Sequence, residues 1–380
     1  MVREATRRGV LAAVVSLPLV ATGCKGIGAL GTPPRQQPDV TVVRDAIDGE
    51  TLMISRYNAV LAAVPALAGS LGPLLQQHRE HLARLRARLI EPDTASPPEH
   101  PPAVASSTAG SPVPGTPAAA RAYLRHAEQA AAQALLGRLT AAPPSLAQLL
   151  ASIAASEATH ALLLGPGRRA EQQRMSASIP PLAAGAAARG AGQAAGRPAA
   201  AAAAVGALQA ALAAEHAAVY GYGVAGAHLS GARQKAAAQD WQIHEASRDA
   251  LAAMITALGA QPVAAAAAYR LPFRVSSGRA AVSLAAFLED RVATAYLGVV
   301  ALGETRLRLF GARALESAAL RAAGWRGRTL AFPGLEAPAP SQPALRAPTP
   351  GPSTPGPSTP GPSSPGPASQ SPPPTGPAGA

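Results

Sequence analysis

The stretch "LAQLLASIAASEATHALLL", residues 146–164, decides the fold that we expect for this chain. It is rich in Ala and Leu and contains neither Gly nor Pro, so it predicts a helix. Glu157 and His160 lie three residues apart within it, and side chains at that spacing share one face of a helix. Burying ionisable groups is costly unless they pair or bind a cation, so this pair indicates an inward polar cluster.

Three further helical stretches precede this one and complete a predicted four-helix bundle. Apolar residues at spacings of three and four predict helices at about 41–63, 66–91, 118–140 and 145–164. The first and last junctions are short enough for antiparallel hairpins, whereas the middle segment, residues 91–117, is long. Two hairpins joined by one long crossover are typical of the ferritin-like variety of bundle.

The same plan returns in the second half of the chain. Helices are predicted at about 203–228, 232–258, 279–302 and 305–324, with the long segment "GAQPVAAAAAYRLPFRVSSG" in the middle. An alignment of the two halves pairs Glu50 with Glu215 and Tyr57 with Tyr222, which indicates a divergent duplication. The predicted fold is therefore all-α, with two tandem ferritin-like four-helix bundles over 40–165 and 203–335 and one long crossover in each.

Four motifs in the second bundle carry a resemblance to a known family. They are "ALQAALAAEHAAVYGYGVAGAHL", "YRLPF", "LEDRVATAYLGVV" and "FPGL". Together they make residues 205–335 similar to an actinobacterial ferritin-like domain family whose function is not established. The resemblance implies a ferritin-like bundle for roughly a third of the chain. The first bundle resembles the family only through its helix plan and the internal alignment.

Acidic and histidine residues on all four helices of the first bundle form a candidate metal site. Ferritin-like metal proteins place one Glu on each of two helices and a Glu-x-x-His pair on each of the other two. The candidates are Glu50, His78, His81, Glu128, Glu157 and His160. With a rise of about 1.5 Å per residue, Glu50, His78, Glu128 and Glu157 can all occupy one layer of the bundle. The departure from the pattern is His78, which stands where a Glu is expected.

Carboxylate and imidazole ligands in this pattern favour iron or manganese. If two metals bind and one coordination position stays open, a di-metal oxidase or peroxidase activity becomes possible. Whether the protein is an enzyme stays open at this point. The alternative is a metal-free helical envelope protein that serves as an interaction scaffold or partner-binding module.

The second bundle carries a degenerate version of the same pattern. The matching residues are Glu215, His244, Glu289 and Glu316. Both Glu-x-x-His histidines are missing, because Ser247 and Ala319 occupy their places. We therefore expect a hydrogen-bonded polar network here, which includes Tyr222 and Tyr296, rather than a di-iron site.

The N-terminal residues 1–23 read as an export signal. A basic start is followed by an apolar run and by "VATG" before Cys24, the chain's one cysteine. This segment resembles a bacterial lipobox, with Ala21 where leucine is commoner. Arg7 and Arg8 resemble a twin-arginine signal, although the general secretory route is the alternative. We therefore expect a lipoprotein that is anchored by its N-terminal lipid to the outer face of the cytoplasmic membrane, with residues 24–39 as a tether.

Composition sets the remaining expectations. Residues 166–202 read as a Gly/Ala/Pro linker, and residues 336–380 as a disordered Pro/Ser/Gly/Thr tail. The net charge of +12 favours an anionic envelope polymer or a protein partner. The arginines are dispersed and aromatic residues are scarce, so no nucleic-acid partner is expected. No Ser-His-Asp order, phosphate-binding Gly loop or cysteine pair supports a hydrolase or nucleotide-binding function, and the oligomeric state stays open.

Overall fold

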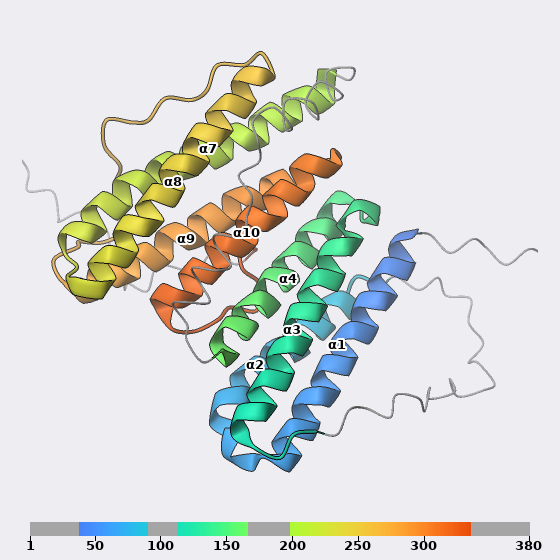
Figure 1. The fold of residues 1–380 in the computed structure, drawn as a ribbon. Helices are drawn as coiled ribbons and strands as arrows, with labels where there is room; N and C mark the ends of the chain where they lie inside the picture. The colour runs from blue at the N-terminus through green and yellow to red at the C-terminus, as the bar shows by residue number, and fades with distance from the viewer. Residues whose placement is uncertain (1–37, 90–112, 166–197, 336–380) are drawn as a thin grey trace, which may run out of the picture. The chain divides into compact units, whose positions relative to one another are not determined.

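The computed structural model describes residues 38–89, 113–165 and 198–335. Over these ranges the chain is helical and contains no strand, which confirms the all-α prediction (Figure 1). The predicted export signal with Arg7 and Arg8, the lipidation residue Cys24, most of the linker and the C-terminal tail lie outside the described residues.

Four helices form the first bundle. They are α1 (Pro38–Ala63), α2 (Ala68–Arg86), α3 (Pro117–Arg138) and α4 (Pro144–Leu164). Short 3₁₀ turns, Pro65–Leu67 and Leu139–Ala141, sit at the two hairpins. Prolines open several of these elements because a first-turn residue needs no hydrogen-bonded N–H. The main difference from the sequence prediction is α2, which ends at Arg86 instead of 91.

Four more helices form the second bundle. They are α7 (Pro198–Ala227), α8 (Gly231–Ala257), α9 (Gly278–Val300) and α10 (Thr305–Arg326). Helix α7 begins five residues before the predicted 203 and takes in the end of the expected linker. Ser277 and Glu304 accept N-cap hydrogen bonds at the starts of α9 and α10. Gly327, with φ 75°, closes α10 in the left-handed conformation.

Helix α4 is buried along nearly its whole length. It packs against α3 within its own bundle and against α10 of the second bundle. One core cluster continues from α4 through α9 and α10, and the described residues of both bundles belong to one compact unit. Arg308 on α10 adds hydrogen bonds of 2.7 Å to the carbonyls of Leu139 and Ala142. The two bundles therefore pack on each other, which the sequence had left open.

Two described helices, α4 and α7, are long and apolar enough to cross a membrane by length and composition alone. The bent run Asp39–Ala63 plus Pro65–Arg86 would add a third if it were counted as one span. In α4, 89% of the apolar window is buried inside the protein, against 33% in α7. A helix that is apolar on all sides is expected where other helices surround it, so packing explains the composition of α4.

Candidate metal centre

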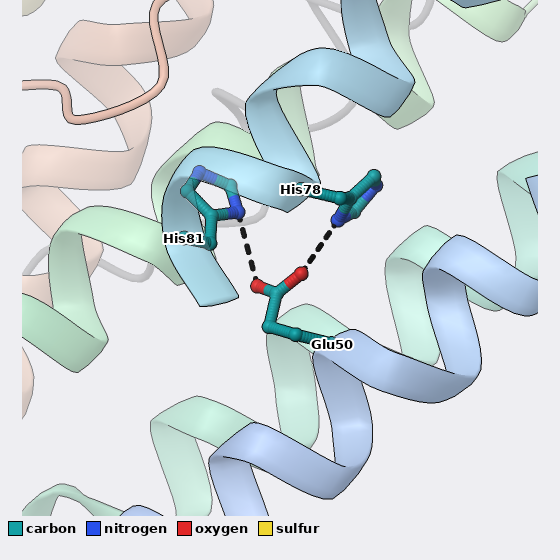
Figure 2. A group of neighbouring side chains, drawn as sticks. All are labelled: Glu50, His78 and His81. Atoms are coloured by element: carbon teal, nitrogen blue, oxygen red, sulfur yellow. Dashed lines mark hydrogen bonds and ion pairs between the residues drawn. The ribbon is translucent and has the colours of Figure 1, made fainter. Parts of the chain in front are cut away.

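Helices α1 and α2 bring together Glu50, His78 and His81 (Figure 2). The Nδ1 atom of His78 lies 2.8 Å from Oε2 of Glu50, and Nδ1 of His81 lies 3.0 Å from Oε1. All three side chains are buried. His78 and His81 face the same carboxylate because residues three apart share one face of a helix. Their ligand atoms lie within 4.8 Å of one another, so this group could hold a metal ion.

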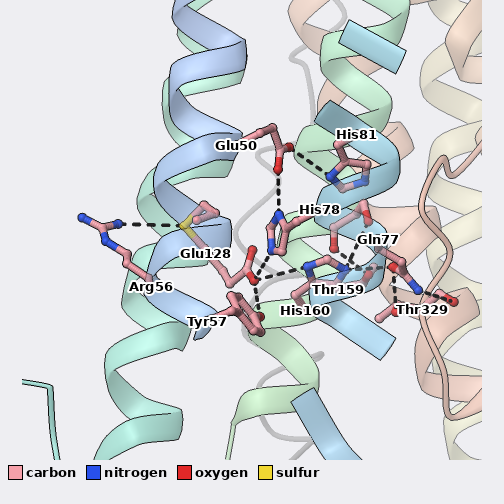
Figure 3. Close-up of polar contacts among 12 residues, drawn as sticks. Glu50, Arg56, Tyr57, Gln77, His78, His81, Glu128, Thr159, His160 and Thr329 are labelled. Carbon is pink, nitrogen blue, oxygen red and sulfur yellow. Dashed lines mark hydrogen bonds and ion pairs between the residues drawn. The ribbon is translucent and has the colours of Figure 1, made fainter. Parts of the chain in front are cut away.

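A second group shares His78 and adds Glu128 from α3 and His160 from α4. The Nε2 atom of His78 lies 2.9 Å from Oε1 of Glu128, and Nδ1 of His160 lies 3.2 Å from the same oxygen. Figure 3 shows His78 between Glu50 and Glu128, with His160 also directed at Glu128. These ligand atoms also lie within 4.8 Å of one another. His78 therefore belongs to both groups, each through a different ring nitrogen.

Glu157, the remaining candidate, is buried on α4, and one of its oxygens has no hydrogen-bond partner. Its Oε2 atom and the Oε2 atom of Glu128 both lack a partner among the described residues. Burial and the neighbouring carboxylates of Glu50 and Glu128 raise the pKa of Glu157 well above its ordinary value. A buried carboxylate oxygen without a partner is rare in folded proteins, and a bound cation would satisfy it.

His81 and His160 each form a hydrogen bond through Nε2, on the side of the ring away from the carboxylates, and this bond fixes which ring nitrogen carries a proton. Nε2 of His81 lies 2.7 Å from the carbonyl oxygen of Ala331, which can only accept a hydrogen bond. Nε2 of His160 lies 2.8 Å from Oε1 of Gln77. Thr329 orients this amide, because its hydroxyl donates to Oε1 and its carbonyl accepts from Nε2 of Gln77. Both imidazoles therefore carry a proton on Nε2 and direct Nδ1 inward.

When both imidazoles are neutral, this tautomer places an unprotonated nitrogen against a carboxylate oxygen at two places. One is His81 Nδ1 against Glu50 at 3.0 Å, and the other is His160 Nδ1 against Glu128 at 3.2 Å. Two acceptors at this distance repel each other unless a proton or a metal cation lies between them. Metal-binding histidines characteristically donate their outer N–H to an oxygen in this way. The donor set therefore fits a metal ion.

The charges of the cluster are strongly coupled. Burial alone would lower the pKa of His78, but the carboxylates of Glu128 and Glu50 outweigh it and hold this pKa well above its ordinary value. Burial would raise the pKa of Glu50, yet His81 and His78 bring it down to about 2. The pKa of His160 is lowered, chiefly because burial disfavours the imidazolium. Without a metal, His78 is thus a cation inside the cluster.

Residues 328–335, the segment of the second bundle that follows α10, contact the side chains that surround this centre. Besides Ala331, the carbonyls of Leu330 and Pro333 accept hydrogen bonds of 2.8 Å from Ser156 and Ser152 on α4. The ring of Phe332 packs edge-on against His81, with centroids 5.3 Å apart. Sequence reasoning missed this role, and the only available signal was the "FPGL" motif in an otherwise unassigned segment.

The second bundle contains a similar but different network. His244 bridges two glutamates, with Nδ1 2.6 Å from Glu215 and Nε2 3.0 Å from Glu289. Tyr222 donates to Glu289 at 2.6 Å and Tyr296 donates to Glu215 at 2.7 Å. The expected hydrogen bonds of both tyrosines are present, and three of the four predicted residues belong to the network: Glu215, His244 and Glu289. Among the described residues, both three-ligand groups that could hold a metal lie in the first bundle.

Arg321 is the member of this network that the sequence analysis did not identify. Its Nε atom donates to Oε1 of Glu289 at 2.8 Å, and the side chain is only 3% exposed. Glu316, in contrast, pairs with Arg313 at 3.2 Å and has no contact of this kind with Glu289 or His244 among the described residues. The arginine places a permanent positive charge beside Glu289, so this network is neutralised from within the protein.

The fold and the site define an all-helical protein with buried Glu/His clusters that could hold a metal ion. Residues 207–337 match the model of a domain of unknown function (DUF4439), so this part of the chain carries such a domain. A similar solved structure is that of a conserved hypothetical protein, rv2844, from Mycobacterium tuberculosis. It shares 38% sequence identity, covers 33% of this chain and 96% of its own, and has a TM-score of 0.32. A comparison with curated proteins finds no match.

Proposed function

We propose that the first bundle binds iron or manganese between its four helices. The observation that carries this proposal is the inward direction of Nδ1 in His81 and His160, set by their outer hydrogen bonds. Each nitrogen faces a buried carboxylate oxygen, an arrangement that favours a cation between them. The Oε2 atoms of Glu128 and Glu157 have no hydrogen-bond partner among the described residues, and a bound cation would stabilise both carboxylates.

Six residues would hold the metal. We assign the carboxylates as ligands or bridges and the imidazoles as nitrogen ligands: Glu50, Glu128 and Glu157, and His78, His81 and His160. When bound, iron or manganese would supply redox chemistry toward oxygen or peroxide. The chain itself orients the ligands: Ala331 and Gln77 hold the two outer N–H groups, and the Tyr57 hydroxyl donates to Glu128.

A metal-free scaffold is the second candidate, and one observation favours it for the second bundle. There Arg321 supplies the cation that a metal would otherwise provide, so the buried acids need no ion. Under this alternative both bundles act as rigid helical supports, and the basic surface holds an envelope partner. The first bundle differs because the corresponding contact with the central glutamate, Glu128, is made by His160 and not by an arginine.

We further propose that the protein is exported and carries a lipid on Cys24. The support is the sequence alone: the apolar run, the small residues before Cys24 and the Arg7-Arg8 pair. In this proposal the protein is a ferritin-like lipoprotein of the actinobacterial type, anchored outside the cytoplasmic membrane near anionic envelope polymers. Metabolic labelling with a radioactive fatty acid tests it, since the label should appear in the parent and be absent from Cys24→Ala.

Metal-dependent thermal unfolding tests the central proposal. The full chain, purified without a histidine tag, is unfolded without metal and after anaerobic addition of manganese(II) or iron(II). A specific ion at 100 times its Kd should stabilise the folded state by about 2.7 kcal/mol. Glu157→Ala and His160→Ala should remove this stabilisation, whereas Glu80→Ala, an exposed acid on α2, should keep it. The scaffold alternative predicts no metal effect in any variant.

A further inference from the structure

A cavity of about 980 Å³ lies beside the candidate metal centre. Its walls come from α2, from α3, from the end of α4 and from the turn after α10, residues 327–329. Pockets that bind small molecules typically have volumes of about 300 to 1,000 Å³, so this cavity is large enough for one. It is separate from the second polar network and is not occupied by any of the six candidate ligands.

The cavity is positively charged. Arg121, Arg125 and Arg328 line it, and none of the described residues in its wall is acidic. None of the three forms an ion pair with another described residue. The Nε atom of Arg125 is buried and has no hydrogen-bond partner among the described residues. A buried guanidinium N–H without an acceptor is unfavourable, and an anionic group is the acceptor that a guanidinium binds best.

Another part of the cavity wall is apolar. Leu71 and Leu74 of α2 and Leu163 and Leu164 of α4 contribute apolar side chains to the same cavity. A cavity with clustered guanidinium groups and an apolar wall suits a molecule that has an anionic head and an apolar body. A bare inorganic anion would leave this apolar wall unused.

One residue connects the cavity with the metal centre. Gln77 lines the cavity, and its Oε1 atom accepts the hydrogen bond from Nε2 of His160 (Figure 3). Thr329, which orients the Gln77 amide, also lines the cavity. A molecule in the cavity would therefore lie one side chain away from a candidate metal ligand.

We propose that this cavity binds an organic anion with a carboxylate or phosphate head group and a short alkyl chain. The head group contacts Arg125 and Arg121, and the chain packs against Leu74, Leu163 and Leu164. Binding needs no metal, because every group it uses belongs to the cavity wall. The proposal can therefore fail while the metal site is real, and the reverse is also true.

Isothermal titration calorimetry on the metal-free full chain, kept in chelator, tests the proposal. Octyl phosphate and octanoate are the two anionic probes, and together they show which head group is preferred. 1-Octanol tests the need for charge, and inorganic phosphate tests the need for the alkyl chain. The variants are Arg125→Gln and the exposed Arg121→Gln. Arg274→Gln, an exposed arginine in the second-bundle crossover, is the matched control.

The proposal predicts saturable one-to-one binding of at least one anionic probe. Loss of a charge-assisted contact should weaken it by about tenfold or more in Arg125→Gln and Arg121→Gln, with no change in Arg274→Gln. If Arg125→Gln fails to fold, as judged by circular dichroism, Arg121→Gln alone decides. Absence of binding, equal binding in the arginine variants, or equally tight binding of 1-octanol or inorganic phosphate would overturn the proposal.

Discussion

His160 and Arg321 make corresponding contacts in the two bundles, each with the central glutamate of its own bundle. His160 places Nδ1 3.2 Å from Oε1 of Glu128, and Arg321 places Nε 2.8 Å from Oε1 of Glu289. In both bundles the same glutamate oxygen also contacts a bridging histidine and a tyrosine hydroxyl. Arg321 thus places a permanent cation beside Glu289 in the second bundle, whereas His160 places an imidazole nitrogen beside Glu128 in the first. This difference, together with Ser247 in place of a second histidine like His81, separates a self-neutralised network from a candidate metal site.

Removal of the Arg321 charge should strongly destabilise the protein. Arg321→Met leaves Glu289 buried with one cation fewer, and breaking a buried ion pair in this way costs about 3–5 kcal/mol. Chemical denaturation of the full chain measures the effect. Arg313→Met is the control, because Arg313 is 44% exposed and its pair with Glu316 should contribute less than about 1 kcal/mol. Equal losses in the two variants would contradict this account of the network.

Without a metal, the ionisation of Glu157 should make the free energy of unfolding depend on pH. Its folded-state pKa is raised, so the folded state favours the neutral acid. The stability that this preference contributes is present below the ordinary pKa of 4.5 and is lost as pH rises toward the folded-state value. Glu157→Gln keeps the size of the side chain and removes this loss.

Denaturation of metal-free parent and Glu157→Gln between pH 4 and pH 8 checks this prediction. The variant should gain stability relative to the parent as pH rises, by roughly 1 kcal/mol or more at neutral pH. Glu80→Gln, at an exposed position, should follow the parent. A variant that loses stability relative to the parent as pH rises would show that Glu157 is well paired without a metal.

His244 should stay charged at neutral pH. Burial would lower its pKa, but Glu289 and Glu215 raise it to about 9. Because the folded pKa lies above the unfolded value of about 6.5, the stability from His244 is present below pH 6.5 and is lost as pH rises through 9. A histidine NMR titration should give a midpoint near 9 for the resonance that disappears in His244→Gln. A midpoint near 6.5 would contradict the bridging geometry.

Substitution of Gly334, which lies in the second bundle, should lower the metal affinity of the first bundle. Its φ is 78°, and an added Cβ would lie 2.9 Å from the carbonyl oxygen of Ala293 and from a methyl group of Leu297. Gly334→Ala should therefore displace the segment whose Ala331 carbonyl orients His81. Loss of such an outer hydrogen bond typically lowers metal affinity by about 10–100-fold.

Manganese titration of Gly334→Ala measures this loss. Gly259→Ala is the matched control, because Gly259 has φ 77° but nothing within 4 Å of its added Cβ. It shares the backbone strain and lacks the clash, so its metal affinity should equal that of the parent. An unchanged affinity in Gly334→Ala would show that the segment after α10 does not position His81.

Much of the fold follows from the sequence because helix periodicity and hairpin lengths are local features. The pattern around residues 146–164 predicts α4 to within one residue. The early end of α2 at Arg86 was missed, since apolar spacing continues to Ile90 while the helical hydrogen bonds stop. The packing of α4 against α10 is a tertiary contact, and no local pattern in either helix encodes its partner.

The candidate site was likewise predicted only in part from the sequence. Glu50, His78, His81, Glu128 and His160 could be placed together because helix rise fixes their heights from the hairpins. Arg321 was missed because an arginine in an Ala-rich helix usually faces solvent. The role of Ala331 could not be predicted either, because its backbone carbonyl carries no residue-specific signal. Such outer contacts depend on where a distant loop settles in the fold.

Metal content is the measurement that tests the central claim most directly. The full chain is purified without a histidine tag, reconstituted anaerobically with iron(II) or manganese(II), desalted and analysed by elemental mass spectrometry. We predict one or two tightly bound equivalents per chain. They should be lost in Glu157→Ala and kept in Glu316→Ala, the corresponding change in the second bundle. No bound metal in the parent, or the same content in Glu157→Ala, would contradict the claim and leave both bundles as scaffolds.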